Sequence, residues 1–287
     1  MDRDIIFEIL DNSEYLPDLP ENVSEILDLL KNPVELDIDI LIEKVSQSGE
    51  LNKLMLKNLN TGYFQLHKEI KSIKEAVIYL GMQTVENLLI FFITLQLFPK
   101  TKEKKSRTFN MHHYWKHVLG TSVAGSMLSS RMKIGDKYKI FSYGLIHDIG
   151  IITLDTCLPD LIDEITEKLK NGVHQLVAER IAMGGITHAD IGAWICRRWN
   201  IREDITNIVE FHHTPFAAKS NFEEVQLIYV ADVISTEYYE KLLGLNLNHT
   251  ISKKAMGNLG LTEDNLKEVI EEFPSELEKV AHYFSFY

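Results

Sequence analysis

The spacing of apolar residues is the feature that most restricts how this chain can fold. Between residues 70 and 97, apolar side chains recur at intervals of three and four, the repeat of a helix with one buried face. The members of this stripe are Ile73, Val77, Leu80, Val85, Leu88, Leu89 and Phe92. Few runs in the chain alternate with the period of two that strands require. We therefore predict an all-α fold.

Several helix ends can be predicted from single residues. Gly81 interrupts the apolar stripe, so we expect one helix to end there and another to begin. Asp37 and Thr262 precede helical patterns and can accept hydrogen bonds from the free N–H groups of a first turn. The most apolar stretch, Leu88–Phe98, is about half as long as the roughly 20 residues that span a bilayer. We expect it to be a buried core helix.

A polar and mostly basic segment divides the sequence. Pro99 ends the apolar stretch, and Lys100–Arg107 follows with the sequence KTKEKKSR. This segment could be a nucleic-acid patch or a solvated connection. We favour the connection because the whole chain carries a net charge of −12, which repels polyphosphate. The prediction is two packed helical lobes, an N-terminal one over residues 1–100 and a C-terminal one over residues 108–287.

Cysteine content and the N-terminus bear on the compartment. Cys157 and Cys196 are isolated and form no C-x-x-C pair, which suits a reducing environment. The first residues are acidic where a secretory signal would need a basic start. We expect a cytoplasmic protein with no membrane partner and no general affinity for nucleic acid.

Histidines and aspartates gather in the predicted C-terminal lobe. The set comprises His117, His147, Asp148, His188, His212, His213 and Asp232, with His113 as an additional candidate ligand one helical turn before His117. Asp148 lies in an apolar run, and Asp232 shares a helix face with Val225 and Ile228. A buried ionised carboxylate costs several kcal/mol unless it is paired or coordinated.

Two interpretations of this set are open. Histidine and carboxylate ligands suit Zn, Fe, Mn or Ni, and the lack of paired cysteines disfavours a purely structural zinc finger. The alternative is a metal-free buried network in which each histidine donates to an aspartate or a carbonyl. For the whole set we favour a metal site.

Other polar and aromatic residues have simpler interpretations. We expect packing roles for Trp115, Trp194, Trp199 and Cys196, and surface positions for His67, His112, His174, His249 and His282. Glu179, Asp190 and Glu210 could support metal ligands or could simply be solvated.

These residues carry a resemblance to a known family. The order of His117, His147-Asp148 and Asp232 resembles the HD superfamily of metal-dependent phosphohydrolases, and His188 with His212-His213 makes it similar to the binuclear HD-GYP branch. Three blocks, at residues 16–30, 46–64 and 70–90, are similar to the N-terminal part of HDOD domains, which are bacterial signalling modules. The HDOD resemblance covers about residues 15–220.

The resemblance implies an HD-like helical bundle in the C-terminal lobe and one or two divalent transition metals, Fe or Mn before Ni or Zn. It implies one site formed by His117, His147, Asp148 and Asp232, and a second formed by Asp148, His188, His212 and His213. Asp148 belongs to both because a carboxylate has two oxygens and can bridge two ions.

The chain departs from its relatives in two respects. Many HDOD proteins have lost the metal ligands, whereas this chain keeps the full set. HD-GYP phosphodiesterases carry a lysine where this chain has Ile151, and a Gly-x-Gly-Tyr-Pro signature where it reads TPFAAKSNFEE after His213. We therefore expect hydrolysis of cyclic di-GMP to be absent or very slow.

Three functions remain open, and no residue is assigned a catalytic role. We favour a signal-transduction module that acts on protein partners in trans. The alternative is a metal-dependent phosphohydrolase that acts on a nucleotide or another small phosphorylated ligand. A DNA-binding regulator with a helix-turn-helix within residues 46–90 is disfavoured by the acidic charge.

Overall fold

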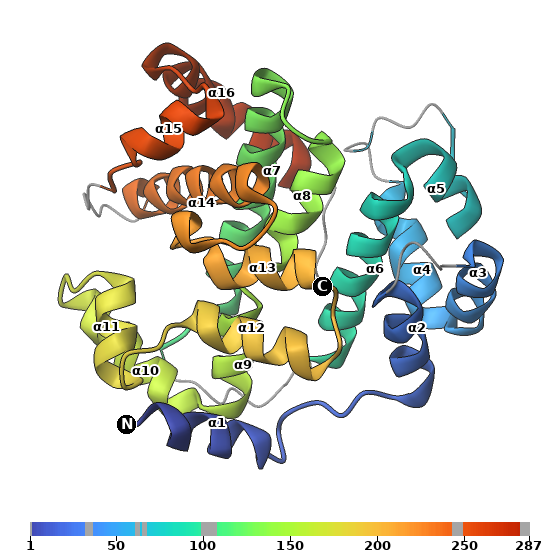
Figure 1. Cartoon of the computed structure of the whole chain (residues 1–287), viewed down its shortest axis with the longest axis horizontal. Helices are drawn as coiled ribbons and strands as arrows, with labels where there is room; N and C mark the ends of the chain where they lie inside the picture. The colour runs from blue at the N-terminus through green and yellow to red at the C-terminus, as the bar shows by residue number, and fades with distance from the viewer. Residues whose placement is uncertain are drawn as a thin grey trace.

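The structure is a computed structural model that describes residues 2–31, 37–60, 64, 68–98, 108–242 and 249–281. Every regular element in these ranges is a helix, and none is a strand (Figure 1). The prediction of an all-α fold is confirmed.

The helices before residue 99 are α1 (Arg3–Asp11), α2 (Glu21–Lys31), α3 (Ile38–Gln47), α4 (Gly49–Leu59), α5 (Ile73–Leu80) and α6 (Met82–Leu97). Those after residue 107 are α7 (Met111–Met132), α8 (Lys137–Ile146), α9 (Ile149–Cys157), α10 (Pro159–Lys170), α11 (Gln175–Ala182), α12 (His188–Arg198), α13 (Glu203–Phe211), the short 3-10 helix η2 (Pro215–Ala217), α14 (Phe222–Leu242), α15 (Lys253–Leu259) and α16 (Glu263–Ala281).

The predicted helix ends are confirmed. Gly81 separates α5 from α6 with a φ of 79°, a left-handed conformation that glycine adopts without steric cost. The Asp37 carboxylate accepts hydrogen bonds from the N–H groups of Asp39 and Ile40 at the start of α3. The Thr262 hydroxyl accepts one from the N–H of Asn265 in α16.

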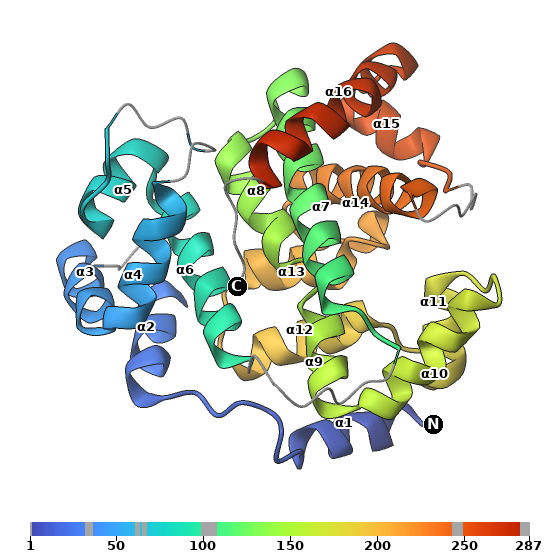
Figure 2. The same cartoon turned by 180° about the vertical axis from the view of Figure 1, so that it is seen from behind.

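Helices α2 to α5 gather on one side of α6, whose other side faces the later helices (Figures 1 and 2). Within the later group, α7 packs against α8, α14 and α16. Helix α1 lies apart from α2 to α5 and against α12, where Phe7 contacts Trp194 at 6.1 Å between ring centroids. The predicted division into residues 1–100 and 108–287 stays a prediction, and the segment Lys100–Arg107 lies outside the described residues.

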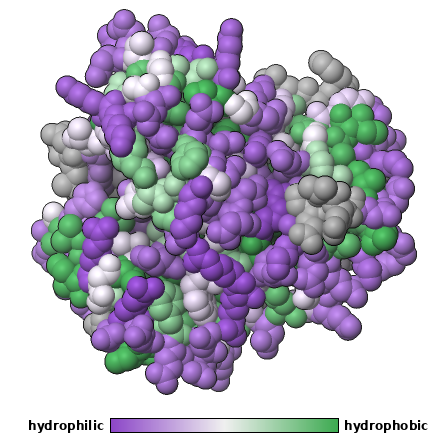
Figure 3. All heavy atoms as spheres, in the orientation of Figure 1, coloured by the Kyte–Doolittle hydropathy of each residue, from purple (hydrophilic) through white to green (hydrophobic). Residues whose placement is uncertain are grey.

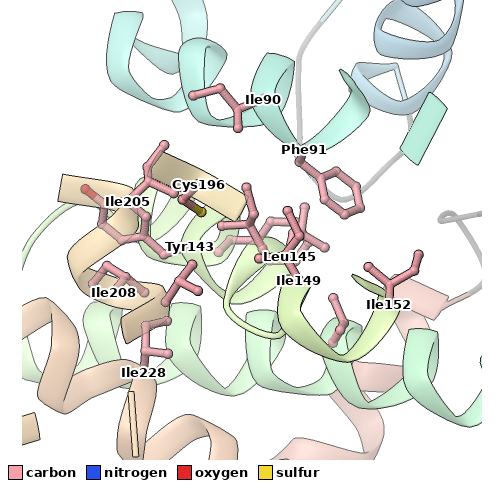
Figure 4. Close-up of a cluster of buried hydrophobic side chains, with 14 of the residues drawn as sticks. Ile90, Phe91, Tyr143, Leu145, Ile149, Ile152, Cys196, Ile205, Ile208 and Ile228 are labelled. Atoms are coloured by element: carbon pink, nitrogen blue, oxygen red, sulfur yellow. The ribbon is translucent and has the colours of Figure 1, made fainter. Parts of the chain in front are cut away.

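Helix α6 is buried along most of its length. Ile90 and Phe91 point from it towards Leu145, Ile149 and Cys196 of the later helices (Figure 4). The expectation of a core helix over the most apolar stretch is confirmed, and no helix in the described ranges has the length and apolar character to cross a membrane. The face shown in Figure 3 is covered largely by hydrophilic residues, with apolar side chains in smaller patches.

A buried ionic network joins α6 to α8 and α13. Arg202, just before α13, donates hydrogen bonds to Glu86 and Asn87 of α6 and to Asp204. Tyr143 of α8 donates its hydroxyl hydrogen to Asp204 at 2.9 Å. Burial raises the pKa of the Glu86 carboxyl, and the Arg202 guanidinium opposes that rise. These contacts hold the N-terminal helices to those that carry the candidate ligands.

This network generates a stability prediction. Arg202→Met should lower the free energy of unfolding by about 3–5 kcal/mol, because it leaves Glu86 buried without its cation. Arg198→Met, which removes a more exposed ion pair with Asp11, should cost at most ~1 kcal/mol. Urea denaturation followed by circular dichroism measures both, and equal small losses would contradict the prediction.

Candidate metal centre

Separate helices bring the predicted ligands together. His117 lies in α7, and His188 is the first residue of α12. His212 and His213 directly follow α13, and Asp232 lies in α14. His147 and Asp148 occupy the break between α8 and α9.

The break at His147 and Asp148 was not predicted, because both flanking segments are apolar and read as one run. Helix α8 ends at Ile146, and the His147 Nδ1–H donates to the carbonyl oxygen of Gly144 at 2.7 Å. Helix α9 then begins at Ile149, with the Ile151 N–H donating to the Asp148 carbonyl at 2.9 Å. This turn directs both side chains into the centre.

Gly150 allows α9 and α12 to approach closely. A Cβ atom at this position would lie 1.9 Å from the carbonyl oxygen of His188 and 2.8 Å from the backbone nitrogen of Gly192. No side chain fits that space, so glycine is required for His188 to lie next to Asp148.

The two oxygens of Asp148 face different histidines. Its Oδ1 lies 3.1 Å from the Nε2 of His188 and 3.4 Å from the Nε2 atoms of His147 and His212. Its Oδ2 lies 3.4 Å from the Nε2 of His117. Two compact groups result, whose ligand atoms lie within 4.8 Å of one another: His117, His147 and Asp148, and Asp148, His188, His212 and His213.

Hydrogen bonds within the second group cannot satisfy both contacts of the His188 Nε2 with one proton. The His188 Nε2 lies 3.2 Å from the Nε2 of His212 and 3.0 Å from the Nε2 of His213. The Nδ1–H of His212 donates to the Val209 carbonyl at 2.8 Å. In a neutral ring this leaves the His212 Nε2 unprotonated, with a lone pair. Facing nitrogens repel unless a proton or a metal cation lies between them. One proton can serve only one of the two contacts.

Asp232 contacts members of both groups. Its Oδ1 lies 3.1 Å from the Nε2 of His117, and its Oδ2 lies 3.3 Å from the Nδ1 of His213. Asp232 was expected in the first site only, with His117, His147 and Asp148, so its contact with His213 of the second group is an addition.

His113 is not brought into the centre. It is exposed in the first turn of α7, and among the described residues it belongs to neither compact group. The four-residue spacing puts it on the His117 side of the helix but one turn further from the other ligands. The suggestion that His113 is an additional ligand is not supported by this position.

The electrostatics favour ionised carboxylates and a neutral His147. Burial lowers the pKa of His147 to about 4. Burial alone would raise the pKa of Asp148, but the neighbouring imidazoles of His147 and His188 hold it well below its ordinary value. Burial also lowers the pKa of His117, yet its hydrogen bonds to Asp148 and Asp232 outweigh this and raise it to about 10.

Two buried atoms test whether a metal fits. The His147 Nε2 and the Asp148 Oδ1 have no hydrogen-bond partner in the described part of the chain. Both atoms carry a lone pair that can coordinate a metal ion. Leaving a buried polar atom without any partner lowers the stability of the fold by about 1–3 kcal/mol. The donor set of imidazoles and carboxylates therefore fits a divalent metal ion.

Glu179 supports a ligand, which the sequence left open. It is fully buried, and its carboxylate accepts hydrogen bonds from the backbone N–H of His188 at 2.9 Å and from its Nδ1–H at 2.8 Å. This contact orients the His188 ring with its Nε2 towards Asp148. Asp190 instead caps α12 with Thr187, and Glu210 pairs with Arg197, so neither touches the ligands through these contacts.

The remaining expectations mostly hold. Trp115 and Trp199 are buried, and Trp194 packs on Phe7 while partly exposed. Cys196 is fully buried, and burial raises its thiol pKa to about 12, so it is not a nucleophile. His112 and His174 are exposed, whereas His249 is partly buried beside Glu240; His67 and His282 lie outside the described residues.

Comparisons with known proteins agree with this geometry. The family model of the HDOD domain matches residues 16–215. A curated protein of Treponema pallidum (strain Nichols), named "Uncharacterized protein", is 27% identical over 207 residues, a match that covers 71% of this chain and 39% of that protein. The chain thus spans about two fifths of the length of this relative.

Two crystal structures have a similar fold. An HDOD domain protein with unknown function from Geobacter sulfurreducens gives a TM-score of 0.72 at 20% identity, covering 99% of this chain and 97% of that one. A "Putative phosphohydrolase" from Shewanella amazonensis SB2B gives a TM-score of 0.69 at 19% identity, covering 96% of this chain and 98% of that one. At these identities the similarity establishes the fold alone.

The approach of α9 and α12 yields a prediction about Gly150. Gly150→Ala should displace His188 from Asp148 and reduce the metal bound per chain. It should also lower the free energy of unfolding by about 1–3 kcal/mol. Gly257→Ala, in α15 where a Cβ meets no atom within 4 Å, is the matched control and should leave metal content unchanged. Elemental analysis and urea denaturation test both variants, and a fully metal-loaded Gly150→Ala protein would contradict the prediction.

The sharing of Asp148 predicts that ligand substitutions are not equivalent. Asp148→Ala should remove both ions, whereas His147→Ala should deplete mainly the first group and His188→Ala mainly the second. Elemental analysis of variants purified from identical cultures gives the ions per chain. Wild type without stoichiometric transition metal would favour the metal-free network. A single ion that depends only on His117, His147 and Asp148 would indicate a mononuclear centre.

Proposed function

The chain belongs to the HDOD domain family, and we propose that it is a bacterial signal-transduction module built around a binuclear divalent-metal centre. The observation that carries the proposal is the position of Asp148 between the two histidine groups: its Oδ2 faces His117 of the first group, and its Oδ1 faces His188 of the second. A carboxylate placed in this way can bridge two cations. The described ligands are imidazoles and carboxylates, which suit Fe, Mn, Ni and Zn. We propose Fe or Mn on the resemblance to the HD superfamily, with Ni or Zn as alternatives.

The regulatory role is supported by how the ligands are distributed. Ions held at this centre would tie together α7, the α8–α9 break, α12, α13 and α14. Helix α13 has His212 at one end and Arg202 at the other, and Arg202 contacts Glu86 of α6. Metal occupancy would thereby affect how α6 is held. Such a module would act on protein partners in trans.

Cyclic di-GMP is a poor substrate on this proposal. Ile151 is buried in α9 and provides no cation for a phosphate. The chain after His213 forms η2, with Phe216 exposed, and does not contain the Gly-x-Gly-Tyr-Pro sequence.

The alternative function is a metal-dependent phosphohydrolase, and the accessibility of the centre favours it. The side chains of His117 and His213 are 19% and 21% exposed, whereas those of His147, His188 and His212 are 0% exposed. A small phosphorylated ligand could reach the centre from the side of His117 and His213. When bound, divalent ions lower the pKa of water and neutralise phosphoryl oxygens. Asp148, Asp232 and the histidines of the two groups would hold the ions, and the three buried imidazoles would also exclude water from the opposite side.

A substrate panel separates the two functions. If the module is regulatory, wild-type protein loaded with Fe or Mn should hydrolyse phosphoesters no faster than Asp148→Ala does. The panel comprises p-nitrophenyl phosphate, bis-p-nitrophenyl phosphate, nucleotides and cyclic di-GMP. Product release is measured by absorbance and chromatography. Turnover of any member that depends on both metal and Asp148 would establish the phosphohydrolase instead, and efficient cleavage of cyclic di-GMP would show that the lysine and the missing loop are dispensable.

A further inference from the structure

A second cluster of metal-ligating side chains lies outside this centre. His249 and Glu240 form a hydrogen-bonded pair, with the His249 Nε2 2.7 Å from the Glu240 Oε2. The ring of His174 lies 5.7 Å from that of His249, measured between centroids. The three residues come from the residue before α11, the last turns of α14 and the segment before α15, which meet at the same edge of the molecule in both views (Figures 1 and 2).

The ring separation and the His249–Glu240 contact are close to the values for a shared ion, and His174 must turn to complete the group, because the three ligand atoms do not all lie within 4.8 Å of one another. Two imidazoles on one tetrahedral Zn²⁺, with Zn–N bonds of about 2.0–2.1 Å, have ring centroids roughly 5 Å apart. A histidine nitrogen and a carboxylate oxygen on the same ion lie roughly 3.3 Å apart, so the 2.7 Å pair needs to open only slightly. His174 is exposed and makes no side-chain capping hydrogen bond to α11, so its ring is free to turn towards the pair.

The backbone that carries His249 is held in place. The Tyr229 hydroxyl donates to the carbonyl oxygen of Thr250 at 3.4 Å and accepts from the N–H of Ser252 at 3.2 Å. The side chains of His249 and Glu240 are only 16% and 20% exposed. Two of the three donors are therefore positioned before any ion binds, which reduces the entropy lost on binding.

We propose that His174, Glu240 and His249 form a second, outer site for a divalent transition metal such as Zn²⁺. The donors are two imidazoles and one carboxylate, a set that zinc accepts with water in the fourth position. The ion would join the start of α11 to the end of α14. Helix α11 also carries Glu179, which holds His188, so the outer ion would restrain the helix that orients a ligand of the inner centre.

Zinc binding to the full chain tests the outer site. Equilibrium dialysis should show one Zn²⁺ per chain that Asp148→Ala retains, because Asp148 is not part of the outer site. Replacing any one of the three ligands should lower the affinity for this Zn²⁺ by at least the roughly 10–100-fold expected for loss of an outer-shell partner. The variants are His249→Gln, Glu240→Gln and His174→Gln. His112→Gln, which alters another exposed histidine, is the matched control and should bind as wild type does.

Three results would overturn the proposal. If no zinc remains bound to Asp148→Ala, His249 and Glu240 form a hydrogen-bonded pair only, and the zinc of the wild type belongs to the inner centre. If His249→Gln binds zinc as wild type does, the outer site is excluded. If only His174→Gln binds as wild type does, the three-residue site is wrong. Thermal melts confirm that each surface variant is folded, so loss of zinc cannot be ascribed to unfolding.

Discussion

The ionised carboxylate of Asp148, buried between helices, is the constraint on which the rest of this structure depends. An isolated carboxylate in this environment costs several kcal/mol, so it needs cationic or hydrogen-bonding neighbours on every side. Four histidines from α7, the α8–α9 break, α12 and the end of α13 place an Nε2 within 3.4 Å of its oxygens. The packing of these helices therefore satisfies this charge in addition to burying their apolar faces.

Further interactions make that arrangement possible. Gly150 removes the side chain that would separate α9 from α12, and Glu179 fixes the ring of His188 from behind. Arg202 holds α13 against α6 at the end opposite to His212. Gly150, Glu179 and Arg202 would affect the centre by positioning its ligands, not by touching a bound ion. A change at any of them should therefore be detected first in metal content and stability.

The relation to the family follows from the same contacts. The HDOD fold supplies the helical frame, and this chain keeps a complete His/Asp set within it. Ile151, buried in α9, stands where the HD-GYP phosphodiesterases that the sequence resembles carry a lysine. On the proposed function, metal binding and phosphate recognition would use different residues, because the His/Asp set supplies the metal ligands while phosphate contacts need additional cations.

The sequence by itself determined the features that depend on neighbouring residues. Apolar spacing indicated helices, Gly81 and Asp37 marked helix ends through local backbone and capping preferences, and the residue types of the His/Asp set indicated divalent-metal chemistry. Sequence did not indicate the break at His147, because its apolar flanks suit one helix or two. Nor could it separate His113 from His117, since both share a helix face. Only the tertiary structure decided that Glu179 holds His188 and that Arg202 binds Glu86, 116 residues away. Such contacts depend on how helices far apart in the chain pack together, and no local pattern contains that information.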